Sequence, residues 1–216
     1  MNTANAGQQD LLVAFRDRAA AAGIDPEGLF AEAKEIIVFG SRAARVNCDT
    51  SDLDVVCVTR GKRKIKTPEL DCLCLPPDEW TGPYWRGCEL GSHIAEFGVW
   101  IKGGDEWRHD TRISDAAINR KERRVRSLIG SVHRVWPAFH TLFRLKYAVT
   151  VRRELQRLAL LQDRAPIPPT PILDLRWQTG AQQAYELLDV APVARHCDFA
   201  RFLVKLLRSA GSPFQA

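Results

Sequence analysis

Two apolar runs separated by an acidic pair constrain the fold of this chain more than any other segment. The first run, residues 36–39, ends in Gly40-Ser41, and the second begins at Leu53 between Asp52 and Asp54. Residues i and i+2 of a β-strand share a face about 7 Å apart. The two carboxylates are therefore predicted to face one space, where they repel each other unless a proton or a divalent cation lies between them.

A second feature of the same segment is the Gly40-Ser41 turn ahead of the acidic pair. Such a turn offers free backbone N–H groups and a hydroxyl, both of which suit phosphate oxygens. A phosphate-binding turn next to paired carboxylates indicates metal-assisted phosphoryl or nucleotidyl transfer.

A third carboxylate, Asp71, lies between Leu70 and Leu73 in an apolar run over residues 69–75. A charge within such a run is costly to bury without a partner. If this strand lies beside the strand that follows Asp52, three carboxylates converge and form a site for two cations, for which hard oxygen ligands select Mg²⁺ or Mn²⁺. The alternative is that Asp71 faces solvent from an edge strand.

The spacing of these residues resembles a known family. Phe39-Gly40-Ser41, ten intervening residues and then Asp52-Leu53-Asp54-Val55 are similar to the signature of the nucleotidyltransferase superfamily related to DNA polymerase beta, in its small bacterial and kanamycin-nucleotidyltransferase-like type. The resemblance covers about residues 30–104. It departs from the bacterial pattern Gly-Ser-Arg-Ala-Arg-Gly at Ala44, which replaces the second arginine, and at Arg45, which replaces the last glycine.

The resemblance implies roles for the three acidic residues. Asp52 and Asp54 would bind both cations, and Asp71 would bind one of them. Asp71 could also accept the proton of the attacking hydroxyl. An NMP would pass from an NTP such as ATP to an acceptor, with release of pyrophosphate.

The same resemblance implies a nucleotide-binding set. Gly40 and Ser41 would hold the β- and γ-phosphates, and Arg42 and Arg45 are candidates to neutralise the leaving group, because a guanidinium fork matches phosphate oxygens. A solvent-facing role for either arginine remains open.

The pattern of elements predicts an α/β (α+β) fold with a small mixed sheet flanked by helices, followed by an all-helical C-terminal domain. Residues 1–9 are expected to be a flexible tail, 10–104 the catalytic domain and 105–216 a helical domain that binds substrate or a partner. We expect residues 61–67 to be a basic connection, and the aromatic segment around Trp80, Tyr84 and Trp85 to be a loop that covers the core edge or stacks on a base. The helices expected after residue 105 span 113–132, 136–163, 173–189 and 192–210.

Charge and composition leave the acceptor open. The net charge is +5, with basic runs at residues 62–66 and 120–126 that are either solvated surface or contacts for a polyanion. The acceptor could be a small molecule, a protein or an RNA, and an antitoxin-like binding module that acts by forming a complex with a partner protein is the alternative to an enzyme. No run of eighteen apolar residues exists and the first residues do not resemble a signal peptide, so we expect a cytoplasmic protein without a membrane span.

Six cysteines are present, and none forms a CxxC pair. Cys57, Cys72 and Cys74 fall within apolar strand-like runs, where a free cysteine acts as a small core hydrophobe. Their spacing disfavours a zinc knuckle.

Overall fold

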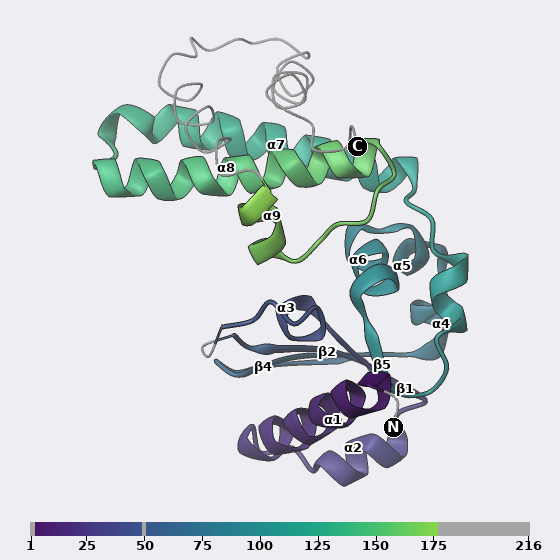
Figure 1. Ribbon diagram of the computed structural model, residues 1–216. Helices are drawn as coiled ribbons and strands as arrows, with labels where there is room; N and C mark the ends of the chain where they lie inside the picture. Colours follow the sequence, from purple (N-terminus) through teal and green to yellow (C-terminus); the bar gives the residue numbers. More distant parts are fainter. Residues whose placement is uncertain (1–2, 49–50, 177–216) are drawn as a thin grey trace. The chain divides into compact units, whose positions relative to one another are not determined.

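A five-stranded mixed sheet lies at the centre of the first part of the chain (Figure 1). The computed structural model describes residues 3–48 and 51–176. The strand order is β3-β4-β2-β1-β5, in which β2 and β4 are parallel and the other neighbours antiparallel. The strands are β1 (Glu35–Phe39), β2 (Leu53–Val58), β3 (Arg63–Lys66), β4 (Leu70–Leu75) and β5 (Val99–Lys102). This mixed sheet with flanking helices confirms the predicted α+β class.

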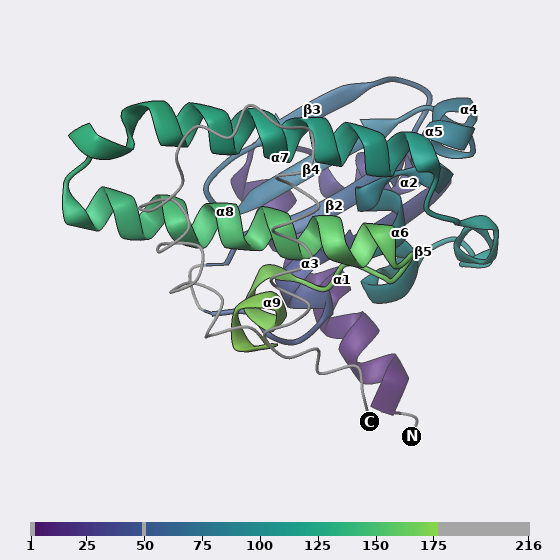
Figure 2. The ribbon, with the colours of Figure 1, turned by 90° about the horizontal axis from the view of Figure 1, so that it is seen from above.

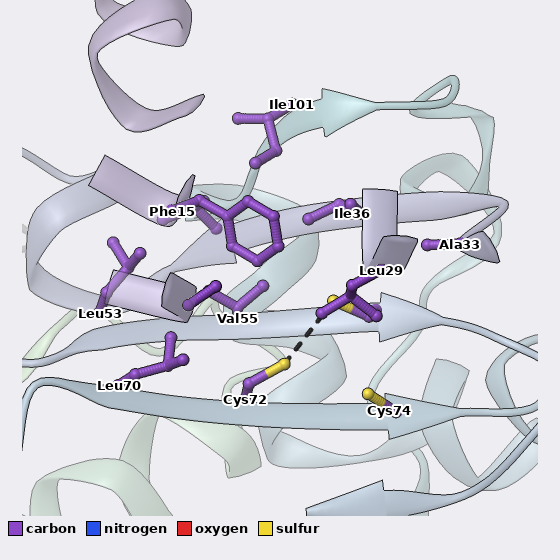
Figure 3. Close-up of a cluster of buried hydrophobic side chains, with 13 residues drawn as sticks. Phe15, Leu29, Ala33, Ile36, Leu53, Val55, Leu70, Cys72, Cys74 and Ile101 are labelled. Atoms are coloured by element: carbon purple, nitrogen blue, oxygen red, sulfur yellow. Dashed lines mark hydrogen bonds between the residues drawn. The ribbon is translucent and has the colours of Figure 1, made fainter. Parts of the chain in front are cut away.

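One face of the sheet packs against the two N-terminal helices, α1 (Thr3–Ala21) and α2 (Pro26–Glu32) (Figures 1 and 3). Every second residue of β2 and β4 points into this core, so that Val55, Cys57 and Cys72 are fully buried beneath Phe15 of α1. The helix α2 begins after Asp25, which acts as its N-cap because its carboxylate accepts a hydrogen bond from the Glu27 N–H at 3.2 Å.

The opposite face is covered by an aromatic core. Ile37, Val56 and Leu75 from the sheet meet Trp80 and Trp107, whose rings stack with their centroids 3.9 Å apart. The elements on this side are α4 (Pro77–Trp80), α5 (Pro83–Gly87), α6 (Glu89–Phe97) and the 3₁₀ helix η1 (Glu106–Asp110). The helix α3 (Gly40–Ala43) follows β1 directly.

Three segments of this unit differ from their predicted local structure. Residues 3–9 belong to α1 rather than to a tail, and the Gln8 amide donates a hydrogen bond to the Trp100 carbonyl. Residues 63–66 of the predicted basic connection form β3, because they complete the sheet by pairing with β4. The aromatic segment forms α4 and α5, in which Trp80 and Trp85 are buried.

A helical hairpin makes up most of the described part of the second unit, which begins at Ser114. The helices α7 (Asp115–Val135) and α8 (Thr141–Gln162) lie side by side around a core that includes Val125, Ile129 and Leu155 (Figure 2). The 3₁₀ helix η2 (Trp136–Ala138) joins them, and α9 (Thr170–Arg176) follows. No strand occurs in the described part of this unit, which agrees with the predicted helical half. The helix expected over residues 192–210 lies outside the described residues, and so do residues 177–189 of the helix expected over 173–189.

The division between the units falls between Ile113 and Ser114, later than the boundary expected near residue 104. The intervening η1 carries Trp107, which is 5% exposed and stacks on Trp80 within the first unit. Within residues 3–48 and 51–176, no helix is both long and apolar enough to cross a membrane.

Candidate active site

The parallel pairing of β2 with β4 brings two of the predicted acidic residues together. Asp54 and Asp71 are direct register partners on these strands, and their side chains share the sheet face opposite to α1. Asp52 precedes Asp54 by two residues and is half-buried just before β2 begins. The condition that the sequence left open, that the strand of Asp71 lies beside that of Asp54, is therefore met in the fold.

Electrostatics show that the three carboxylates interact. Burial raises the pKa of Asp54 from 3.8 to about 6, and the negative charges of Asp52 and Asp71 act in the same direction. A carboxylate with a raised pKa among like charges is stabilised by a cation that bridges it to its neighbours. The donors are hard oxygens, which fit Mg²⁺ or Mn²⁺.

Gly40 lies against Asp54 so closely that no side chain fits between them. Its φ is +75°, and a Cβ atom placed on it would lie 2.2 Å from Oδ2 of Asp54. The cause is the β1–β2 pairing, in which Phe39 is the register partner of Asp54. The Gly40 N–H donates to Nε2 of the buried His93 at 3.3 Å, so this N–H is already engaged within the protein.

Ser41 and Arg42 occupy the first turn of α3. Ser41 is half-buried. The Arg42 guanidinium donates from Nε and Nη2 to the Ser51 carbonyl, at 2.9 and 2.7 Å. Arg42 thus fixes the residue that directly precedes Asp52, and two of its N–H groups are used in doing so.

Arg45 follows α3 with a φ of +57°, in the left-handed region that favours glycine. This is the position at which the bacterial members of the resembling family carry glycine. The side chain is exposed and its guanidinium lies against Gly7 of α1, where a Cβ would meet Nη2 at 2.0 Å.

Two lysines of β3 contact the site and were not among the predicted residues. Lys66 Nζ lies 2.8 Å from Oδ2 of Asp71 and Lys64 Nζ lies 3.4 Å from Oδ1. Burial raises the pKa of Asp71, but the hydrogen bond from Lys66 and the charge of Lys64 outweigh it and hold that pKa below its usual value. The alternation Lys64-Ile65-Lys66 was the available signal, because both lysines of a strand with this pattern share one face.

The other sequence features contribute less to this site. Trp80 and Trp85 belong to the aromatic core, whereas Tyr84 is 60% exposed. In the basic run at residues 120–126, Lys121 is buried in the second unit and pairs with Glu154 at 2.9 Å. That run is therefore not wholly a solvated surface.

The chain was compared with protein families, curated proteins and solved structures. No protein-family model matches the chain, and no curated protein matches it. Among solved structures, the chain is similar to a nucleotidyltransferase-like protein from Exiguobacterium sibiricum, with 12% identity and a TM-score of 0.35 over 92% of this chain and 74% of that one.

Proposed function

We propose that the chain is a Mg²⁺- or Mn²⁺-dependent nucleotidyltransferase that moves an NMP from an NTP to a hydroxyl of an acceptor and releases pyrophosphate. The observation that carries the proposal is the register pairing of Asp54 with Asp71 beside Gly40, with Asp52 close enough to raise the pKa of Asp54. Three carboxylates next to a glycine-serine turn fit metal-assisted transfer better than they fit a structural role.

Each residue of the site has a distinct part in this reaction. Asp52 and Asp54 would hold the cations, and Asp71 would hold one of them; bound cations would neutralise the phosphate charge and orient the reacting oxygens. Ser41 would bind the β- or γ-phosphate with its hydroxyl. Arg42, which is hydrogen-bonded to Ser51, would position the segment before Asp52.

The lysines of β3 modify the role of Asp71. An ion-paired carboxylate with a lowered pKa is a weak proton acceptor, so we propose that Asp71 acts as a ligand rather than as the general base. If Asp71 binds a metal cation instead of the two lysines, Lys64 and Lys66 become available to bind the phosphates of the NTP.

The test uses Asp54→Asn, which keeps the size of the side chain and removes its charge. We expect this variant to lose Mg²⁺-dependent pyrophosphate release from α-labelled NTPs in the presence of cell extract, while its circular dichroism stays unchanged. Asp78→Asn, at an exposed position of α4, is the matched control and should keep full turnover. Mass spectrometry of the labelled product would identify the nucleotide and the acceptor. Equal turnover in Asp54→Asn and the unsubstituted protein would refute the proposal.

One observation favours the alternative, an antitoxin-like binding module. Two lysines already neutralise Asp71, as they would in a site that needs no cation. Isothermal titration with Mg²⁺ and NTP separates the two functions, because the enzyme must bind the nucleotide in a metal-dependent way and a pure binding module need not.

A further inference from the structure

Three buried thiols meet on the sheet face opposite to the acidic site. Cys57 of β2 and Cys72 and Cys74 of β4 have their Sγ atoms within 4.8 Å of one another, and all three side chains are fully buried. Figure 3 shows Cys72 and Cys74 side by side on β4. Cys57 and Cys74 are register partners, and the Cys57 and Cys72 sulfurs are 3.6 Å apart. The cluster arises from pairing between strands, and so it is invisible to any spacing rule along the sequence.

The separations match those of sulfurs that share one metal ion. A metal–sulfur bond of about 2.3 Å places two sulfurs of a trigonal site about 4 Å apart. The cluster needs only small side-chain movements to reach this arrangement. Among the described residues, no other histidine, cysteine or carboxylate joins the group, which indicates three-coordinate rather than tetrahedral binding.

A positive charge is already in place beside the sulfurs. Arg63 of β3 is the register partner of Cys74, and its Nε donates to the Cys74 Sγ at 3.3 Å. The Arg63 side chain is half-exposed, and its Nη2 also lies 3.8 Å from Oε2 of Glu32, so its charge is shared between Glu32 and the sulfurs.

We propose that Cys57, Cys72 and Cys74 form a binding site for one soft metal ion, Cu(I), with Arg63 as the countercharge. Soft thiolates select Cu(I) over hard cations. All three cysteines would bind as thiolates, and the charges of Cu(I) and of the Arg63 guanidinium would offset two of the three negative charges. The cysteine protons displaced by the ion pass to solvent, and no electron is transferred. The two faces of the β2–β4 pair would then select metals of opposite character, hard ions at Asp54 and a soft ion at Cys57.

The test titrates the full chain with Cu(I) alone, without oxygen and against a colorimetric Cu(I) chelator. We expect one equivalent to bind, with ultraviolet sulfur-to-copper charge-transfer absorption and a higher thermal unfolding midpoint. Cys57→Ala, Cys72→Ala and Cys74→Ala should each lower the affinity at least tenfold. The matched controls are Cys88→Ala, which also removes a buried thiol, and Cys48→Ala, which removes an exposed one; both should bind as the unsubstituted protein does.

Two further variants keep the test decisive if a core cysteine variant fails to fold. Arg63 is half-exposed, so Arg63→Gln should fold normally and bind Cu(I) several-fold more weakly, and increasingly so at low pH where protons compete for the sulfurs. Asp54→Asn should bind Cu(I) unchanged, which makes this result independent of the proposed nucleotidyl transfer. Absence of equimolar binding to the folded protein, unchanged binding in Arg63→Gln, or saturation by Zn²⁺ but not Cu(I) would each overturn the proposal.

Discussion

Replacing Gly40 with alanine tests the contact on which the candidate active site is built. The substitution imposes two costs. A non-glycine residue at a φ of +75° loses about 1–2 kcal/mol relative to glycine. The new Cβ would also lie 2.2 Å from Oδ2 of Asp54, and overpacking of this kind costs about 1–3 kcal/mol. We therefore expect Gly40→Ala to lower the free energy of unfolding by about 2–5 kcal/mol.

Substitutions at two other glycines measure the cost of backbone strain separately from the cost of the steric clash. Gly23 has a φ of +74° but nothing within 4 Å of the position that a Cβ would take, so Gly23→Ala should show the backbone cost alone, about 1–2 kcal/mol. Gly61 has neither a positive φ nor a close neighbour, and Gly61→Ala should stay within about 0.5 kcal/mol of the unsubstituted protein. Urea unfolding followed by tryptophan fluorescence suits the comparison, because Trp80 and Trp107 are buried in the first unit.

A double variant identifies Asp54 as the partner of the steric clash. Asp54→Ala removes Oδ2 and Cγ and leaves only the Cβ, 3.4 Å from the new methyl group. Gly40→Ala should therefore cost about 1–3 kcal/mol less in an Asp54→Ala background than alone. The reasoning is refuted if Gly40→Ala is no more destabilising than Gly23→Ala, or if the two substitutions are additive.

Three further predictions concern charge and backbone conformation. The pKa of Asp54 is about 6 in the folded protein and 3.8 as a free group, so the folded state binds the extra proton and loses stability as the pH rises through this range. Asp54→Asn should therefore raise the free energy of unfolding by about 1–3 kcal/mol at pH 8, allowing for solvent screening. Below pH 4 the same substitution should have almost no effect, and urea titrations at the two pH values measure the difference. Arg45→Gly should stabilise the protein by about 1 kcal/mol by removing the strain at φ +57°, and a lower thermal midpoint in calorimetry would contradict this. Glu154→Ala removes the carboxylate that pairs with the buried Lys121 ammonium, and it should lower the free energy of unfolding in urea by about 3–5 kcal/mol. Replacing both residues, by Lys121→Met and Glu154→Leu, should lower it much less.

The sequence was sufficient to predict β1, β2 and β4, because each is an apolar run with a clear end. Proximity of Asp54 and Asp71 was predictable only on condition that their strands are neighbours. Strand order depends on pairing between segments far apart in the chain, which local patterns do not determine. The partner of Arg42 was likewise unpredictable, because a backbone carbonyl leaves no mark in the sequence.

The strand β3 was missed for a physical reason. It is an edge strand with a single apolar residue, Ile65, between lysines, and charged side chains are typical of edges that must not pair with another chain. Its composition therefore resembles that of a solvated connection. Residues 3–9 of α1 were expected to be part of a tail for a similar reason, because they are polar and extend beyond the apolar contacts of Phe15 and Ala19.

The alternation of β3 gives this edge strand a part in both sites. Lys64 and Lys66 reach Asp71 on one face of β4, while Arg63 reaches Cys74 on the other. An edge strand is joined to the sheet along one side only, so it is among the first elements to open locally. Local opening of β3 would remove the lysine ammonium groups from Asp71 and the Arg63 guanidinium from Cys74 at the same time. If a cation displaces the two lysines from Asp71, we expect β3 to shift, and with it the guanidinium next to the sulfurs.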